Sequence, residues 1–397
     1  MKRSGRDTVI VAAARTPFGS FGGVFKDLTA VDLGAKAIEA ALERAGRPDE
    51  VDYVFMGLVV GAGAGQVASR QAALKAGLPV QVPSDTINKV CASSLRAVNM
   101  AEGFIRVGEM DTVVAGGMES MSQGPYLLPQ GRWGHRLGHG KLLDATVHDG
   151  LWCPVKDVHM GVHGDTMARE FKVSREEQDA WAYQSHRRAL AAMDEGRFDQ
   201  EIVPVEIPQR KGPPVKVDRD EPPRPDTSPE KLAALRPAFS PDGSVTAGNA
   251  PSLNDGAGAL ILMSRDRAER LGVSPLATII AKGAVSAEAP YLATVPWLSA
   301  KQALDRVGLA PGDMHLVEIN EAFAVVALVS ARLGGWSHDR VNVDGGAVAL
   351  GHPIGASGAR ILMHLVFELR RRGLEHGVAC ICSGGGQGEA TVVRIEE

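Results

Sequence analysis

CASSLR at residues 91–96 recurs in altered form as GASGAR at residues 355–360, and each stretch opens an apolar-periodic segment that predicts a helix. Upstream, ALERAG at 41–46 is matched by ALDRVG at 303–308, with the final glycine placed as a helix C-cap in both copies. The offset between the paired stretches is nearly constant. We therefore infer that the chain contains an internal duplication.

The duplication decides the expected fold class, which is α/β. Strands and helices alternate in both copies, which predicts a mostly parallel sheet in each half with helices on its faces. The two halves are expected to pack as a pseudo-symmetric pair. We predict an N-terminal half at residues 1–121 plus 252–271, an inserted loop domain at 122–251, and a C-terminal half at 272–397.

The insertion differs in character from the two halves. It holds a helical segment at 174–198 and a proline-rich charged run at 208–237. It also contains Trp152, Trp181 and Phe239, large side chains that need burial. These residues favour a folded domain lying over one half rather than a free linker.

Composition narrows the class of protein. The 397 residues carry a net charge of −4, which gives no electrostatic reason to expect nucleic acid or an anionic membrane as a partner. Four cysteines without a regular spacing indicate a reducing compartment, and we expect the cytoplasm. The apolar run at 9–14 stops at Arg15 and predicts a buried strand, because it is too short for a signal peptide or a membrane span.

Cys91 lies where the pattern changes from strand to helix. The N–H groups and dipole of a helix start favour a thiolate, so we expect a lowered pKa and a nucleophilic sulfur. A small buried cysteine is the alternative interpretation. His352 lies on a glycine-bracketed loop just before the second copy of that helix, where packing of the halves would bring it to Cys91 as a general base.

Cys382 ends a strand and is followed by three glycines, of which Gly384 is the first. A second sulfur that acts as an acid or base is one interpretation, and a buried strand cysteine is the other. Cys380 is expected on the opposite face of the strand. Asn320 also follows a strand, where its amide could hold a water or donate to an oxyanion.

Four of these segments closely resemble the signature regions of the thiolase family. They are NKVCAS at 88–93, NEAFA at 320–324, GHPIGASG at 351–358 and CSGGG at 382–386. The resemblance covers essentially the whole chain, including the duplication and the insertion. It implies the thiolase fold, with duplicated α/β halves layered as αβαβα, and an acyltransferase that uses acetyl-CoA, 3-ketoacyl-CoA and CoA.

The resemblance also implies roles for the residues in these segments. Cys91 becomes acylated while His352 accepts its proton, and Cys382 then removes the α-proton of a second acyl-CoA or protonates the enolate in thiolysis. One oxyanion site would use His352 and a water on Asn320, and the other the N–H groups of Cys91 and Gly384. The resemblance implies no cofactor beyond the CoA substrates, and we expect no metal site.

Substrate contacts are implied by the family pattern as well. Expected around the acyl group and the CoA arm are His159, Met160, Arg224, Phe239, Ala247, Gly248, Ser252, Ala322 and Phe323. The pair Pro251-Ser252 departs from the commonest pattern, in which a Ser or Thr that contacts the CoA arm precedes Gly.

Met160 resembles the short-chain members of the family and favours acetoacetyl-CoA over longer 3-ketoacyl-CoA substrates. A ketoacyl synthase or a hydroxymethylglutaryl-CoA synthase is a rival interpretation, but such enzymes need no second cysteine base. A non-catalytic lipid carrier on the same fold is a remote alternative, because all four reactive positions are present. A homo-oligomer, either a dimer or a tetramer, is expected, with the loop around Trp133 as a candidate contact.

Overall fold

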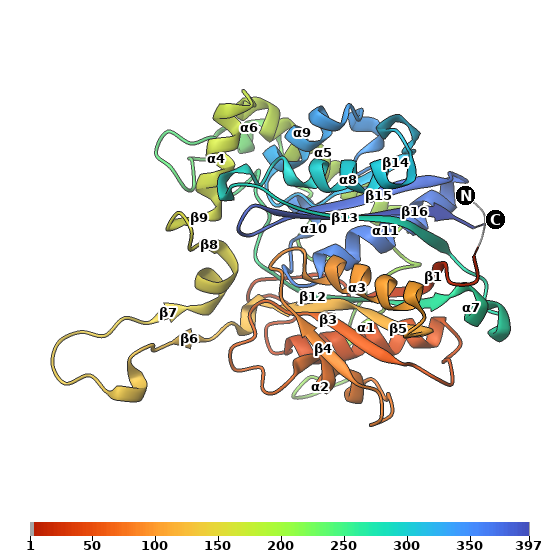
Figure 1. Ribbon diagram of the computed structural model, residues 1–397. Coiled ribbons are helices and arrows are strands. Elements are labelled where there is room, and N and C mark those ends of the chain that lie inside the picture. The colour runs from red at the N-terminus through yellow and green to blue at the C-terminus, as the bar shows by residue number, and fades with distance from the viewer. Residues whose placement is uncertain (1–3, 397) are drawn as a thin grey trace.

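The computed structural model describes residues 4–396 and consists of two stacked α/β halves and a long insertion, part of which projects to one side (Figure 1). A short pairing of β1 with β13, through Val9 with Thr278 and Ile10 with Ala277, joins the strands into one sheet. In sheet order the strands are β14 (Leu316–Ile319), β15 (His376–Ser383), β16 (Gln387–Ile395), β13 (Ala277–Ser286), β1 (Thr8–Arg15), β12 (Asn254–Ser264), β5 (Thr112–Ser120), β3 (Tyr53–Gly57) and β4 (Ser84–Ile87), with β2 (Gly19–Ser20) paired to β12.

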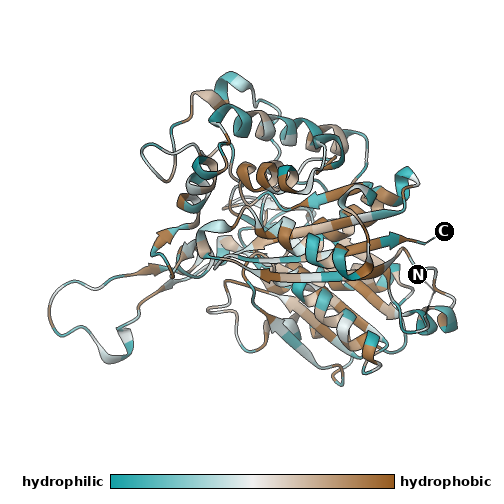
Figure 2. Ribbon diagram, turned by 45° about the horizontal axis from the view of Figure 1, so that its top comes forward, coloured by the Kyte–Doolittle hydropathy of each residue, from teal (hydrophilic) through white to brown (hydrophobic). Residues whose placement is uncertain are grey.

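Helices cover both faces of each half, which gives the predicted αβαβα layering. Two helices pack together in the centre, and an outer pair covers the strands of each half (Figure 1). The central pair is α3 (Ser93–Val107) and α11 (Ser357–Arg372), the N-terminal outer pair is α1 (Ala30–Arg44) and α2 (Ala68–Lys75), and the C-terminal outer pair is α8 (Val295–Val307) and α9 (Ala324–Gly334). Figure 2 shows apolar residues along the strands between these layers.

The repeated stretches found in the sequence occupy equivalent elements. CASSLR and GASGAR enter the first turns of α3 and α11, and ALERAG and ALDRVG close α1 and α8. Both closing glycines adopt positive φ, 76° at Gly46 and 68° at Gly308, as a left-handed helix terminus requires. The duplicated α/β fold predicted from the sequence is confirmed.

The prediction of mostly parallel sheets is wrong, because the sheet is mixed. Pairs linked through a helical crossover are parallel, namely β3 with β4, β3 with β5, and β14 with β15. The tight turn after β15 makes β16 antiparallel, and β12 returns antiparallel from the insertion between β1 and β5. Sequence periodicity marks a buried strand but does not fix its direction.

Small residues allow the starts of the two central helices to meet. The Ala359 N–H donates to Ser94 Oγ at 2.9 Å, and a Cβ on Gly358 would lie 2.6 Å from the Leu95 nitrogen. A Cβ on Gly117 would lie 2.0 Å from the Gly355 carbonyl oxygen. The loops before α3 and α11 are therefore held side by side.

The insertion packs on the C-terminal half through α4 and α5, and the predicted helix at 174–198 is α5. It begins with a capping box between Ser174 and Glu177. Trp181 is buried as expected, but Trp152 is partly exposed. The bounds of the insertion's elements are β6 (Tyr126–Leu127), β7 (Leu143–Asp144), η3 (Thr146–Leu151), β8 (Trp152–Cys153), β9 (Val158–His159), α4 (Met160–Glu170), α5 (Arg175–Asp194), β10 (Val205–Ile207), β11 (Val215–Val217) and α6 (Pro229–Ala233).

Two features lie outside these layers. The β6–β7 hairpin extends far from the body (Figure 1), and its Trp133 and Leu137 are 85% and 100% exposed. Within residues 4–396, no helix combines the length and the apolar character needed to cross a bilayer. The remaining elements are α7 (Arg265–Leu271), α10 (Ala347–Leu350), and the short helical turns η1 (Met121–Gln123), η2 (Gly131–Trp133), η4 (Ala289–Tyr291), η5 (Pro311–Asp313) and η6 (His338–Arg340).

A cluster of buried charged side chains surrounds His364, in the middle of α11. His364 Nδ1 is 3.1 Å from Glu201 Oε2, and its Nε2 is 3.4 Å from Asp344 Oδ2. Burial alone would lower the pKa of His364, but the charge of Glu201 and the bonds to both carboxylates outweigh it and raise the pKa to about 10. His364 is therefore a buried cation.

Candidate active site

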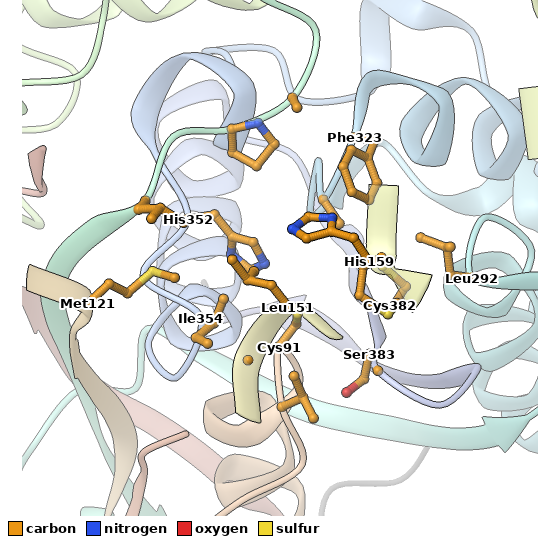
Figure 3. A pocket seen from close by; sticks show the side chains of 18 of the residues that line it. Cys91, Met121, Leu151, His159, Leu292, Phe323, His352, Ile354, Cys382 and Ser383 are labelled. Atoms are coloured by element: carbon orange, nitrogen blue, oxygen red, sulfur yellow. The ribbon is translucent and has the colours of Figure 1, made fainter. Parts of the chain in front are cut away.

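A cavity of about 330 Å³ lies where the two halves and the insertion meet. Figure 3 shows Cys91, His352 and Cys382 gathered around this space. Its walls are Val90, Cys91 and Met121 from the N-terminal half, Val147, Gly150, Leu151, His159, Met160, Phe239 and Ala250–Leu253 from the segment before β12, and Leu292, Ala322, Phe323, His352, Ile354 and Cys382–Gly384 from the C-terminal half.

Cys91 lies on the loop between β4 and α3, and this loop has an unusual backbone. Val90 adopts φ of +44°, a left-handed conformation that is costly for a β-branched residue. The side chain of Asn88 accepts a bond from the Val90 N–H at 3.0 Å, and Ser93 Oγ donates to the Val90 carbonyl at 2.6 Å. These contacts hold the strained turn that presents Cys91 to the cavity.

The expected lowering of the Cys91 pKa is wrong. Burial raises the pKa of this thiol to about 12, and the charge of Glu119 adds to the rise. The N–H groups of Cys91 and Gly384 interact with the sulfur and oppose only part of it. The first residue of α3 is Ser93, so Cys91 lies two residues before the helix begins.

His352 is held from both sides on the loop between α10 and α11. Its N–H donates to Asn254 Oδ1 at 2.8 Å, and a Cβ on the preceding Gly351, at φ of +95°, would collide with the Asn254 side chain. Burial, with a further effect from the charge of Arg360, lowers the pKa of His352 to about 3. The imidazole is therefore neutral near pH 7 and able to accept a proton.

The hydrogen bonds of His352 identify which ring nitrogen is the base. Its Nδ1 is 2.6 Å from Ser357 Oγ, and the Ser357 hydroxyl donates to the Pro353 carbonyl at 3.0 Å. Because the hydroxyl proton is used there, we assign the proton of the His–Ser contact to Nδ1. Nε2 is then the acceptor, and Asn320 Nδ2 lies 3.4 Å from it.

Asn320 follows β14, as the sequence indicated, and its N–H donates to the Cys380 carbonyl at 3.0 Å. Its Oδ1 is buried and has no hydrogen-bond partner among residues 4–396. Buried amide oxygens are normally satisfied, so this atom is a free acceptor beside His352.

Cys382 ends β15 and lines the cavity, and burial, with the nearby Cys91, raises the pKa of its thiol. The expectation for Cys380 is wrong. Residues two apart on a strand share a face, and both sulfurs belong to the same apolar cluster. Cys380 is buried deeper and is not part of the cavity wall.

Glu119, at the end of β5, is a residue that the sequence did not reveal. Its carboxylate accepts bonds from the N–H groups of Val59, Val60 and Gly355 at 3.0–3.2 Å, so it links the N-terminal half to the His352 loop. Burial raises the pKa of Glu119 to about 7, although the three N–H donors oppose this. An acidic residue ending an apolar strand was the only signal for it.

The expected acyl and CoA-arm residues form one aromatic wall. His159 stacks on Phe239 with ring centroids 4.5 Å apart, and Phe239 meets Phe323 edge-on at 6.1 Å. Met160 and Ala322 line the same cavity. The structure therefore brings together five of the predicted contact residues.

Of the other four predicted contact residues, one lines the cavity and three do not. Ser252 lines the cavity, and its hydroxyl donates to Asn254 Oδ1 at 3.1 Å. Ala247 and Arg224 are exposed, Gly248 is buried, and none of the three forms part of the cavity wall. Their role as contacts along the CoA chain stays a prediction.

Sequence reasoning missed most of the apolar wall. Leu151, Leu292 and Ile354 line the cavity, but aliphatic residues in these positions carry no chemical signal. Leu292 lies in the stretch at 291–297, which matched no pattern. Over the described part of the chain, no group of three or more His, Cys, Asp or Glu side chains is arranged to hold a metal ion.

Comparison with known proteins gives consistent matches along the chain. Residues 8–266 match the family model described as thiolase, N-terminal domain, and residues 273–395 match thiolase, C-terminal domain. An acetyl-CoA acetyltransferase of Pseudomonas aeruginosa is 49% identical over 97% of this chain and 98% of its own length. A probable acetyl-CoA acyltransferase of Staphylococcus aureus is 46% identical over 97% of this chain and 98% of its own length.

A solved structure agrees with these matches. The crystal structure of the Bacillus anthracis acetyl-CoA acetyltransferase is similar to this chain with a TM-score of 0.96 and 42% identity. The match covers 98% of this chain and 99% of the other. Two halves and an insertion in this arrangement are therefore shared by both proteins.

Proposed function

The chain belongs to the thiolase family and is an acyltransferase, and from that premise we propose that it exchanges acyl groups between CoA thioesters through an acyl-Cys91 intermediate. The reaction runs as condensation of an acyl-CoA with acetyl-CoA or, in reverse, as thiolysis of a 3-ketoacyl-CoA. The observation that carries the proposal is the single cavity that collects Cys91, His352 and Cys382 from the two halves.

In the first step, Cys91 attacks the thioester carbonyl while His352 Nε2 takes the thiol proton. Both groups are neutral at rest, because the pKa of the thiol is raised and that of the imidazole is lowered. The proton therefore moves as the carbon–sulfur bond forms, rather than beforehand. The bond between the acyl carbon and the CoA sulfur then breaks, and the proton held by His352 passes to the departing CoA sulfur.

In the second step, the Cys382 thiol passes its proton to His352 Nε2 and, as thiolate, removes the α-proton of acetyl-CoA. The resulting carbanion attacks the acyl carbon on Cys91, the bond to Cys91 sulfur breaks, and the departing Cys91 thiolate takes the proton held by His352. In thiolysis the order reverses, and Cys382 gives its proton to the departing carbanion. A ketoacyl synthase would generate its carbanion by decarboxylation, so the cavity-lining Cys382 favours a thiolase.

Negative charge appears on a thioester oxygen in each step and needs donors that are already in place. The N–H groups of Cys91 and Gly384, one from each half, both interact with the Cys91 sulfur and so converge on the first reacting centre. For the second substrate we propose His352, whose Nε2 then carries the proton taken from Cys382 and can donate, together with a water held by the free Oδ1 of Asn320.

For the substrate we propose acetyl-CoA and acetoacetyl-CoA, with the CoA arm passing the aromatic wall of His159, Phe239 and Phe323. Relatives described as acetyl-CoA acetyltransferases support an acetyl group. Met160 and Leu292 bound the cavity and support a short chain. The alternative is a thiolase for longer 3-ketoacyl-CoA, and equal thiolysis rates on C4 and C16 substrates would favour it.

Two variants test the assignment of the sulfurs. Cys91→Ala should give no acyl mass adduct after incubation with acetyl-CoA. Cys382→Ala should still form the adduct at Cys91 but fail to turn over acetoacetyl-CoA and CoA. Full turnover by the second variant would show that Cys382 is not the base.

We also propose a homo-oligomer, a dimer or a tetramer, in the cytoplasm. Several large apolar side chains are exposed together on the projecting hairpin, namely Tyr126, Leu128, Trp133, Leu137 and Leu142. They support contact with a second copy, because exposed apolar side chains gathered on one segment mark an interaction site. All four cysteines are free, which supports a reducing compartment. Sedimentation of the purified protein would give the number of copies.

A further inference from the structure

Lys89, two residues before Cys91, contacts both strands of the hairpin that carries Cys382. Ser383 Oγ, one residue beyond Cys382 on β15, donates to the Lys89 carbonyl. The Lys89 ammonium lies 2.5 Å from Glu389 Oε2 on β16. In the β15–β16 ladder Cys382 pairs with Gly388, so Ser383 and Glu389 flank that pair. One residue of the N-terminal half thus bridges the hairpin that holds the second sulfur.

Glu389 is a carboxylate buried in the interior, with its side chain only 1% exposed. Besides Lys89, it accepts a bond from Asn99 Nδ2 at 2.8 Å, and Arg96 lies 3.7 Å away. Thr391 on the same strand donates to Asn99 Oδ1 at 2.7 Å. The partners of Glu389 therefore all come from the N-terminal half, on α3 and the loop before it. A buried carboxylate needs such partners, and they tie β16 to that loop.

Neither Lys89 nor Glu389 lines the cavity, so neither residue touches the reacting atoms. We propose that Lys89 and Glu389 are positioning residues that fix the separation between Cys91 and Cys382. The proposal rests on the proposed function, because only a reaction that uses both sulfurs on one substrate depends on their separation. Acylation of Cys91 requires His352 and is not expected to depend on this contact.

The charged contact can affect the reaction because it joins two loops that belong to different halves. The loop at 88–92 belongs to the N-terminal half and the β15–β16 turn to the C-terminal half. A shift of about 1 Å between reacting groups can cost about 100-fold in rate. The second step, in which a carbanion made beside Cys382 must reach the acyl carbon on Cys91, is the step that such a shift would slow.

Lys89→Met and Glu389→Gln test the proposal in the full-length protein. Each removes one charge and keeps the size of the side chain, and Lys89→Met leaves the carbonyl that accepts from Ser383. We expect turnover of acetoacetyl-CoA with CoA to fall about 10- to 100-fold. The rate of acyl-adduct formation at Cys91 and the KM for CoA should stay within about threefold of the parent. The double variant should be no slower than either single variant, because both remove one interaction.

Glu102→Gln is the matched control. Glu102 is also buried, also lies on the α3 side, and pairs with Arg106 and with Lys282 of β13, so it too is a charged tie between the halves. Glu102 is not part of the cavity wall. Glu102→Gln should have a lower midpoint of thermal unfolding, and its rates of acylation and of turnover should change by the same factor. If Lys89→Met does not fold, Ser383→Ala removes the other contact between Lys89 and the β15–β16 hairpin. It should likewise slow turnover more than acylation.

The outcomes are distinct. If turnover and acylation fall by the same factor in the Lys89 and Glu389 variants, the contact has only a structural role and the positioning role is overturned. A loss of turnover no larger than that of the Glu102 variant would overturn it as well. Cys382→Ala is measured alongside. If it keeps full turnover, the proposed function itself fails. If it loses turnover while the Lys89 and Glu389 variants do not, only this inference fails.

Discussion

Replacing Ser357 with alanine should slow acylation of Cys91 by about 5- to 150-fold, with little change in the KM for acetyl-CoA. In the structure, His352 Nδ1 is 2.6 Å from Ser357 Oγ, whose own proton goes to the Pro353 carbonyl. The serine oxygen therefore accepts from Nδ1–H and keeps Nε2 free to receive the thiol proton. Alanine removes that acceptor from a fully buried site.

The size of the effect follows from one buried N–H that loses its partner, which costs about 1–3 kcal/mol. The imidazole can avoid this cost if its proton moves to Nε2. Rotation of the Asn320 side-chain amide then lets its free Oδ1 accept a hydrogen bond from Nε2–H. That tautomer cannot take a proton from Cys91. A preference of about 1–3 kcal/mol for it lowers the competent fraction, and hence the acylation rate, by about 5- to 150-fold.

Rapid-quench mass spectrometry of the acetyl adduct measures the rate, and ¹⁵N shifts of the imidazole report the tautomer. Ser299→Ala is the matched control, since Ser299 is equally buried and its hydroxyl also donates to a carbonyl, that of Pro296, at 2.9 Å. The control should acylate normally. Acylation of the Ser357 variant within twofold of the parent, or an Nδ1 that remains protonated in it, would refute the tautomer assignment.

Three further predictions concern stability, the CoA arm and assembly. Because the pKa of His364 is raised to about 10, above its ordinary 6.5, the stability from its charge is complete below pH 6.5 and lost as pH rises through 10. In urea titrations the advantage of the parent over His364→Gln should shrink by about 5 kcal/mol across that range, and a constant difference would contradict the charge. Gly161→Ala should raise the KM for acetyl-CoA several-fold in steady-state assays, because its Cβ would lie 2.1 Å from the Phe239 ring; an unchanged KM would count against the aromatic wall as the path of the CoA arm. Leu137→Asp should shift the sedimentation coefficient towards a smaller species, and an unchanged coefficient would argue against the hairpin as a contact between copies.

The sequence predicted which reactive side chains would share one cavity because their signals are local. Cys91, His352 and Cys382 are reactive side chains at junctions of strands, helices and glycines, and the duplication indicated that the junctions of the two halves would meet. The structure brings all three to one cavity. What the sequence could not supply is burial, which depends on the whole fold. The pKa of Cys91 was therefore predicted in the wrong direction.

Residues that support the site from a distance were the hardest to predict. Glu119 acts through N–H groups that come from two separate segments of the chain, and no spacing in the sequence links it to Gly355. Leu292 shapes the cavity through its volume alone. Strand direction was missed for a related reason, because the long return from the insertion to β12 leaves no mark in the local periodicity.

The neutral state of the resting Cys91–His352 pair agrees with the proposed reaction, in which both halves take part in each step. A protonated Cys91 beside a neutral His352 holds no charge, so burying the pair carries no penalty for an isolated ion. Charge appears only when substrate reacts, and it is then met by N–H groups from Cys91 in one half and Gly384 in the other. Neither half alone would contain a nucleophile with its base, or a complete pair of oxyanion donors. In the proposed reaction, the close packing of Gly358 on Leu95 at the starts of α3 and α11 sets how near these groups can come.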